Sequence, residues 1–306
     1  MESVLGHISK NQVRFIRSLQ QKKVRDEEKL FVAEGDKCIG ELLGHFDLVF
    51  YIRQQATGDR QLATGNWMSL PLYSPTPLIA TPTELEQMSS LKTPQGSIAV
   101  FRQKTEELST TERDGFSKLY TLNSKLILAL DNIQDPGNLG TIIRTADWFG
   151  VTDIYCSKDT ADCYNPKVVQ ATMGALARVS IHYIDLVEWL TDIRHSRNGE
   201  TSDIPTPIHP YSPTPIYGTL LDGRNIYEQG AIADTAGGII IMGNEGNGIS
   251  AEVREFITHP LYIPSYTQST IAQRAHYPQS THIESLNVAV ATAITLAEFR
   301  RQFTTK

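Results

Sequence analysis

The chain has 306 residues, of which 40% are hydrophobic, which is enough for two ordinary domains with separate cores. Its formal net charge of -6 at pH 7 argues against nucleic-acid binding over the whole surface, because phosphate binding needs clustered Lys and Arg. We find neither an apolar run of membrane-spanning length nor a secretory signal pattern, and we therefore expect a soluble, cytoplasmic protein without a membrane segment. The three cysteines, Cys38, Cys156 and Cys163, lack paired spacing, so we expect neither a disulfide framework nor a bound metal.

The N-terminal third alternates short helical and extended patterns, which predicts a small α/β domain. Residues 13–19 and 38–43 have helical spacing, and residues 30–33 and 48–52 are extended. A basic cluster lies between residues 10 and 29 and contains Arg14, Arg17, Lys22, Lys23 and Arg25. This cluster is either a solvated helix face or a binding surface. A polar, charged stretch over residues 103–117 predicts a domain linker.

Beyond the linker, strand and helix patterns alternate. The expected strands cover residues 126–130, 153–156 and 179–184, and the helices that follow them cover 141–149, 167–177 and 186–193. Such alternation favours a mainly parallel sheet covered by helices. The proline-rich residues 204–215 interrupt the series, and we expect a loop there.

Three motifs in the C-terminal half carry polar residues at the ends of apolar segments. The first covers residues 131–144, where a buried strand turns through Pro136-Gly137 into a helix. Asn138 is expected to cap that helix, and Arg144 follows two turns later. Open α/β sheets bind ligands at this edge, although a helix cap and a surface arginine would give the same pattern.

The second motif, residues 238–250, is a buried strand that ends in a glycine-rich loop containing Glu245. Glycine allows a ligand to approach the backbone closely, although a tight turn alone would also explain it. The loop lacks the endings of phosphate-binding and dinucleotide-binding loops. The third motif, residues 283–294, is predicted to be a helix of small and branched residues capped by Ser285, and it could be an ordinary core helix.

Taken in this order, the three motifs resemble the signature motifs of the SpoU (TrmH) family of SPOUT methyltransferases. Residues 165–175 resemble the linking helix of that family, and residues 31–35 and 90–96 resemble the small RNA-binding domain that many members carry. The resemblance implies an α/β fold whose C-terminal, mainly parallel sheet contains a deep trefoil knot. The small N-terminal α/β domain would resemble a ribosomal protein.

The resemblance also implies an enzyme that methylates a ribose 2'-hydroxyl of transfer or ribosomal RNA and uses S-adenosylmethionine as cofactor. The positions that match the cofactor pocket are Gly243, Ile263 and Leu286. Family members work as homodimers. We expect an RNA-binding domain over residues 1–104, a linker over 105–124 and a methyltransferase domain over 125–306.

The catalytic positions implied by the resemblance are Asn138, Arg144, Glu245 and Asn287. Arg144 matches the arginine that activates the hydroxyl, yet a guanidinium stays protonated in water and is a poor base. It would act instead by staying charged beside a phosphate and the developing alkoxide, while a phosphate oxygen or water takes the proton. Asn138 and Asn287 are expected to orient substrate and loops, and Glu245 to hold Arg144 or the knot.

For RNA binding the resemblance favours the basic cluster, with Arg14, Lys22 and Arg25 as contacts. The chain departs from the family pattern at residues 265–282, a polar insertion that is either a lid or a surface loop. Arg274, His276 and Tyr277 of this insertion are candidate RNA contacts.

Two alternatives remain at this point. One is a non-catalytic RNA-binding protein that retains the fold, against which the four intact catalytic positions argue. The other is a nucleotide-binding oxidoreductase, whose glycine fingerprint is absent near the first strand of the α/β domain.

Overall fold

The computed structural model describes residues 6–55, 77–104, 126–195, 214–232, 237–266 and 286–304. The expected linker over 105–124, most of the proline-rich loop and Arg274, His276 and Tyr277 lie outside these ranges. Contacts divide the chain into two compact units. The first comprises Met1–Glu107, Leu139–Arg144 and Asp162–Arg178, and the second comprises Leu108–Asn138, Thr145–Ala161 and Val179–Lys306.

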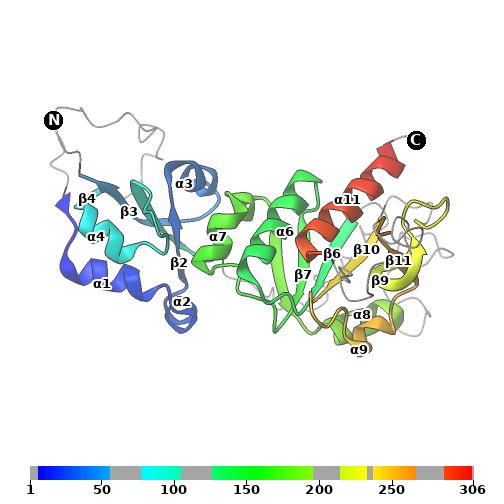
Figure 1. Ribbon diagram of the computed structural model, residues 1–306. Helices are drawn as coiled ribbons and strands as arrows, with labels where there is room; N and C mark the ends of the chain where they lie inside the picture. Colours follow the sequence, from blue (N-terminus) through cyan, green and yellow to red (C-terminus); the bar gives the residue numbers. More distant parts are fainter. Residues whose placement is uncertain are drawn as a thin grey trace, which may run out of the picture. The chain divides into compact units, whose positions relative to one another are not determined.

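The first unit contains a mixed sheet of five described strands in the order β1-β4-β3-β5-β2 (Figure 1). Its strands are β1 (Gly6–His7), β2 (Leu30–Glu34), β3 (Leu48–Gln54), β4 (Leu78–Ala80) and β5 (Ser97–Arg102). β5 runs antiparallel to both of its neighbours, β3 and β2, whereas β4 runs parallel to β3 and β1. The N-terminal third thus alternates short helices and strands, as its sequence pattern predicts.

Helices cover both faces of this sheet. They are α1 (Lys10–Ser18), α2 (Lys22–Glu28), α3 (Asp36–Leu42), α4 (Pro82–Met88), α7 (Pro166–Thr172) and the short 3-10 helix η3 (Ala175–Ala177). On one face, Val13 and Ile16 of α1 and Leu85 and Met88 of α4 pack into a cluster with alternate strand residues. Capping boxes at Ser9 and Thr81 start these two helices, because each hydroxyl accepts the backbone N–H three residues later.

Aromatic rings fill the opposite face. The ring centroid of Phe31 lies 5.1 Å from that of Phe46, 5.6 Å from that of Phe101 and 4.8 Å from that of Tyr164. The helix expected over residues 167–177 is interrupted here, which corrects the prediction. Met173 adopts a left-handed conformation with φ of 51°, which ends α7 before η3 begins.

The second unit contains a sheet of six described strands in the order β11-β9-β10-β6-β7-β8, and every neighbouring pair is parallel. Its strands are β6 (Leu126–Asp131), β7 (Asp153–Ser157), β8 (Ser180–Ile184), β9 (Ile216–Asn225), β10 (Gly238–Gly243) and β11 (His259–Tyr262). The chain moves outward from β6 through β7 to β8, and β10 later takes the place on the other side of β6. The parallel sheet predicted from the sequence is confirmed.

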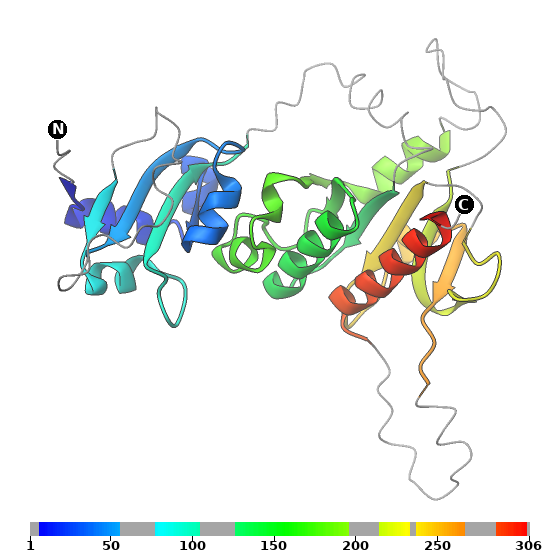
Figure 2. The ribbon, with the colours of Figure 1, turned by 90° about the horizontal axis from the view of Figure 1, so that it is seen from above.

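Described helices lie on both faces of this sheet, as the two views in Figures 1 and 2 show. They are α6 (Pro136–Trp148) and α11 (Val288–Thr304) on one face, and α8 (Leu186–His195) and α9 (Ala251–Arg254) on the other. Ile127 and Ala129 of β6 point into the cluster formed with α8 and α9. Among the described helices we find none with the length and hydropathy needed to cross a membrane.

Candidate active site

The first two motifs contain the carboxyl ends of two neighbouring strands in the centre of the parallel sheet. β6 ends at Asp131 and β10 ends at Gly243, and these two residues are paired in the register of the sheet. From β6 the chain continues to β7, which is the neighbour of β6 on one side. The neighbour on the other side of β6 is β10, and beyond it lies β9. This is the switch point of an open α/β sheet, where the carboxyl ends of strands leave a crevice for a ligand.

The glycine-rich loop after β10 folds back tightly on itself. Asn244 and Gly248 exchange two backbone hydrogen bonds of 2.9 and 2.8 Å. A Cβ on Gly243 would overlap the backbone of Gly248 and Ile249, so only glycine fits at this position. The expectation that Gly243 leaves room for a ligand therefore needs correction, because the space beside its Cα is filled by the returning loop.

Side chains and backbone hold this loop to the first motif. The amide of Asn244 donates to the carbonyl oxygen of Asn132 at 2.8 Å, and the buried carboxylate of Asp131 accepts the backbone N–H of Ser250 at 2.7 Å. Asn132 itself has a left-handed backbone with φ of 59°, and its side-chain oxygen is buried without a hydrogen-bond partner in the described structure. Sequence reasoning missed Asn244 and Asn132; an asparagine directly after a strand was the available signal.

The central feature of the site is a cluster of three polar side chains, one from each motif. One carboxylate oxygen of Glu245 accepts the side-chain amides of Asn138 and Asn287, each at 2.7 Å, and the backbone N–H of Val288 at 3.2 Å. The amide of Asn287 also donates to the side-chain oxygen of Asn138 at 2.9 Å. We call Asn138, Glu245 and Asn287 the motif cluster. The structure thus brings together three of the four positions predicted to be catalytic.

Local helix geometry explains why these side chains are free to meet. Asp135, rather than Asn138, caps α6, and its carboxylate accepts the backbone N–H of Asn138 at 2.8 Å. At the third motif, Asn287 caps α11 by accepting the N–H groups of Ala289 and Val290. The caps predicted at Asn138 and Ser285 are therefore wrong in the residue: Asp135 and Asn287 cap the two helices instead. Ser285, the cap expected from the sequence, lies outside the described residues.

Arg144 lies two turns along α6 from Asn138 and is exposed. Within the described structure it makes no hydrogen bond or ion pair, so Glu245 holds the two asparagines rather than Arg144. Helical spacing places Arg144 on the same exposed face as Thr141 and Trp148. A free guanidinium on an open face can contact a phosphate or a developing negative charge.

The two helices that carry this chemistry lie side by side and run in the same direction. Asn287 bonds Asn138 near their N-terminal ends, and Arg300 donates to the carbonyl oxygen of Phe149 at 2.7 Å near their C-terminal ends. Figure 2 shows α6 and α11 adjacent on the same face of the sheet. The position of Asn138 relative to Asn287 is therefore fixed at both ends of the helix pair.

The other two positions predicted to bind cofactor lie on segments that flank the motif cluster. Leu286 directly precedes Asn287, and 46% of its surface is exposed. Ile263 is half-buried and directly follows β11, whose carboxyl end lies at the same sheet edge as that of β10 because the sheet is parallel. Ser265 and Tyr266, the first residues of the insertion, follow at this edge, and the rest of the insertion lies outside the described residues.

The three predicted RNA contacts of the first unit differ in their surroundings. Arg14 and Lys22 are exposed, and neither makes an ion pair in the part of the chain that is described. Arg25 is 1% exposed, and its guanidinium donates to Asp162 at 2.6 and 3.1 Å and to the carbonyl oxygens of Leu19 and Gln20. The guanidinium makes these four hydrogen bonds within the protein and is buried, so Arg25 is a structural residue and the RNA-binding prediction for it is wrong.

With this geometry established, comparison with known proteins identifies the family. The model of the SpoU rRNA Methylase family matches residues 125–297, more than half of the chain. The protein belongs to the SpoU family. A second model, the MRM3-like substrate binding domain, matches residues 10–99 of this SpoU protein.

Relatives cover nearly the whole length of this SpoU chain. A 23S rRNA guanosine 2'-O-methyltransferase of Bacillus subtilis, RlmP, is 27% identical over 95% of this chain and 97% of its own length. A solved TrmH-family structure from Porphyromonas gingivalis is 34% identical, with a TM-score of 0.72 over 97% of this chain and 100% of that one. The AdoMet-bound rRNA methyltransferase of Sinorhizobium meliloti is 26% identical, with a TM-score of 0.68 over 97% of each chain.

Proposed function

We propose that this SpoU protein transfers a methyl group from S-adenosylmethionine to a ribose 2'-hydroxyl of RNA. The observation that carries the proposal is the motif cluster, in which Glu245 fixes Asn138 and Asn287 while Arg144 on the same helix stays exposed and unpaired. The cluster holds α6 and α11 together, and Arg144 on α6 is left free to meet a substrate.

The chemistry requires a hydroxyl oxygen that is held in line with the methyl donor and can lose its proton. Arg144 stays charged, binds the phosphate next to the target ribose and stabilises the developing alkoxide, while a phosphate oxygen or water removes the proton. Asn138 and Asn287 are occupied by Glu245, so we assign them the role of positioning the two helices rather than contacting the reacting atoms.

The residues beside the motif cluster fit an adenosyl group, which is apolar on its faces and polar at its edges. Leu286 exposes apolar surface, Ile263 is half-buried, and the buried side-chain oxygen of Asn132 has no partner among the described residues. When bound, S-adenosylmethionine supplies the electrophilic methyl group. We propose that Leu286, Ile263 and the backbone of the loop after Gly243 hold it.

Ribosomal RNA is the substrate class we favour. RlmP of Bacillus subtilis and RlmB of Acinetobacter baylyi, which is 28% identical over 73% of this chain, are both named as 23S rRNA guanosine 2'-O-methyltransferases. We propose that residues 1–104 form a substrate-binding domain similar to a ribosomal protein, joined by a linker over 105–124 to a methyltransferase domain over 125–306. Arg14 and Lys22, which are exposed and unpaired in the described structure, support RNA binding by the first of these.

We further propose that the C-terminal chain forms the family's deep trefoil knot and that the protein is a homodimer. Support for the dimer comes from exposed apolar side chains on both helices: Trp148 at the C-terminal end of α6 is 85% exposed, and Val290 in the first turn of α11 is 47% exposed. An exposed tryptophan on a rigid helix face is typical of a protein interface. The cytoplasmic location expected from the sequence stays a prediction.

Calorimetric titration of S-adenosylmethionine into the full-length protein tests the proposal, with Leu286→Glu as the disrupting variant. Leu286→Glu is preferable to a substitution at Gly243, which would break the loop. Leu221→Glu, at another exposed leucine on β9, is the matched control. We expect binding to the wild type and the control but not to Leu286→Glu.

The second arm offers labelled methyl donor with unmodified ribosomal RNA or transfer RNA. A 2'-O-methyl group blocks alkaline cleavage of the adjacent phosphodiester, so an alkali-resistant labelled product identifies the reaction. No donor binding and no methyl transfer, with either RNA present, would contradict the proposal.

A further inference from the structure

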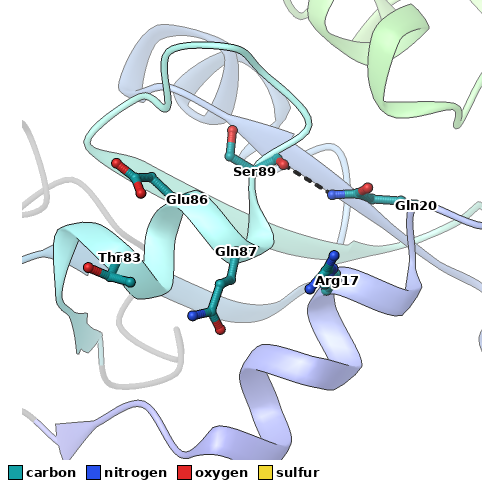
Figure 3. A pocket seen from close by; sticks show the side chains of 6 residues that line it. All are labelled: Arg17, Gln20, Thr83, Glu86, Gln87 and Ser89. Atoms are coloured by element: carbon teal, nitrogen blue, oxygen red, sulfur yellow. Dashed lines mark hydrogen bonds between the residues drawn. The ribbon is translucent and has the colours of Figure 1, made fainter.

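A polar groove lies between α1 and α4 of the first unit, on elements that belong to none of the three motifs. Its volume is about 310 Å³, and it is lined by Arg17, Gln20, Thr83, Glu86, Gln87 and Ser89. Figure 3 shows Arg17 on α1 and Thr83, Glu86 and Gln87 on α4 around it. All six side chains are polar or charged, so the groove is unsuited to an apolar ligand.

Hydrogen bonds make the base of this groove a fixed part of the fold. The amide of Gln20, just after α1, donates to the carbonyl oxygens of Met88 and Ser89 at 3.2 and 3.1 Å. This ties the C-terminal end of α1 to the C-terminal end of α4, which also pack against each other through the buried cluster beneath. The side chains of Thr83, Glu86 and Gln87 make no hydrogen bond or ion pair in the part of the chain that the structure describes, and they remain available to a ligand.

A stripe of positive charge runs along α1 toward the groove. Lys10, Arg14 and Arg17 are exposed and spaced four and three residues apart, which puts them on one face of the helix. α1 contains no acidic residue, and none of the three makes an ion pair within the described ranges. Unpaired cations at this spacing are suited to successive phosphates of a nucleic-acid backbone.

The groove itself has two different ends. Arg17 offers a cation with a planar set of donors, whereas Glu86 offers only acceptors at neutral pH. A ligand for both must carry an anionic group and, close by, a hydrogen-bond donor. RNA carries both in each backbone unit, as a phosphate and a 2'-hydroxyl, whereas DNA has the phosphate alone.

We propose that this groove binds a ribose–phosphate unit of RNA and reads its 2'-hydroxyl, with the phosphate on Arg17 and the hydroxyl on the polar groups of α4. The proposal rests on the proposed function for the identity of the partner. It adds a contact that involves none of the three motifs and selects RNA over DNA. None of the described residues that line the groove is aromatic, so the contact recognises the backbone rather than a stacked base.

Fluorescence anisotropy with a mixed-sequence single-stranded RNA and the DNA of the same sequence tests the groove in the full-length protein. Arg17→Gln should weaken both ligands about tenfold, because a charge-assisted contact to phosphate is lost. It should also reduce the slope of log affinity against log salt by about 0.7. Lys37→Gln, which removes an exposed charge from α3, is the matched control and should change neither.

Glu86→Gln and Gln87→Ala test the selection of RNA. The wild type should bind RNA more tightly than DNA, and each variant should bring the ratio of the two affinities toward one without loss of DNA binding. Glu28→Gln, at an exposed acid on α2, controls for the change in net charge. Circular dichroism spectra identical to the wild type establish that the variants fold.

The outcomes separate this proposal from the proposed function. Equal affinities of the wild type for RNA and DNA, or unchanged affinities in all three groove variants, would overturn the groove as an RNA site even if methyl transfer occurs. Loss of RNA selection in the variants with no donor binding by the wild type would leave the groove standing and remove the methyltransferase. Donor binding by Arg17→Gln equal to that of the wild type is expected, because the groove shares no residue with the motif cluster or the proposed cofactor site.

Discussion

Asn138 and Asn287 are 149 residues apart in the chain, yet their side chains are hydrogen-bonded at 2.9 Å, and both donate to the same carboxylate oxygen of Glu245. A single acceptor atom therefore links the N-terminal end of α6, the loop after β10 and the N-terminal end of α11. Removing this acceptor should affect three segments together, whereas removing either asparagine side chain leaves the other asparagine and the backbone N–H of Val288 bonded to Glu245.

Glu245→Gln should reduce activity strongly and stability only slightly. The variant keeps an amide oxygen that can face the same three N–H groups but loses the negative charge, so the charge-assisted hydrogen bonds become weaker neutral ones. Because Glu245 and Asn287 are exposed, we expect a loss of about 1 kcal/mol in the free energy of unfolding. Urea denaturation and methyl-transfer rates measure the two effects. Glu252→Gln, an exposed acid on α9, removes the same charge elsewhere and should behave as the wild type.

Arg144→Ala should abolish methyl transfer without affecting folding. The guanidinium makes no contact within the described structure, so its removal costs little stability, while a lost transition-state contact is expected to lower the rate about a hundredfold or more. Arg144→Lys keeps the charge but not the planar pair of donors, and we expect partial activity. Activity of Arg144→Ala equal to the wild type would rule out both proposed roles of this residue.

Breaking the buried pair of Arg25 and Asp162 should destabilise the protein far more than breaking an exposed pair. Asp162→Asn leaves a buried guanidinium without its counter-charge, which costs about 3 kcal/mol or more. The exposed pair of Lys23 and Glu27, at 3.9 Å, provides the comparison, and Glu27→Gln should cost less than about 1 kcal/mol. Equal effects in urea denaturation would show that Arg25 is hydrated in solution.

His259 should make stability fall at mildly acidic pH. Burial against Tyr217, with ring centroids 5.1 Å apart, lowers the pKa of His259 from its ordinary value of 6.5. The unfolded chain therefore binds a proton more readily than the folded chain, so stability is complete above about pH 6.5 and is lost as pH falls toward the folded pKa. When the pH is lowered from about 7.5 to about 5.5, the melting temperature of His259→Gln should fall by less than that of the wild type.

Trp148→Glu should shift the proposed dimer toward monomer. A charge at the centre of an apolar contact typically weakens association about a hundredfold or more. Sedimentation equilibrium of this variant, with Leu221→Glu as a control at another exposed apolar residue, measures the change. A wild-type protein that sediments as a monomer at all concentrations would contradict the homodimer itself.

The apolar runs of the sequence predicted the parallel core well, because buried parallel strands are hydrophobic over their whole length. β6, β7, β8 and β10 lie at or within a residue or two of the expected positions. β9 and β11 were not predicted. β9 ends in the polar Asp222 to Asn225, and β11 is a four-residue edge strand containing Pro260, so neither has a strand pattern.

The sequence predicted which residues belong to the candidate site, but not the hydrogen bonds between them. Resemblance supplied Asn138, Glu245 and Asn287, but that they bond one another depends on β10 pairing with β6, which no local pattern reveals. The prediction for Arg25 failed for the same reason. Its partner Asp162 lies 137 residues away, and a basic residue on a short helix looks the same in sequence whether it faces water or a buried carboxylate.

The place of β10 in the centre of the sheet sets the order in which this protein can be assembled during synthesis. β6 is translated first among these strands. Its partner β10 begins only at Gly238, which pairs with Leu126, so one edge of β6 stays open while the intervening chain is made. Open apolar strand edges invite pairing with other chains. We therefore expect nascent chains that end before residue 238 to need chaperone protection, and the native sheet to close only after β10 leaves the ribosome.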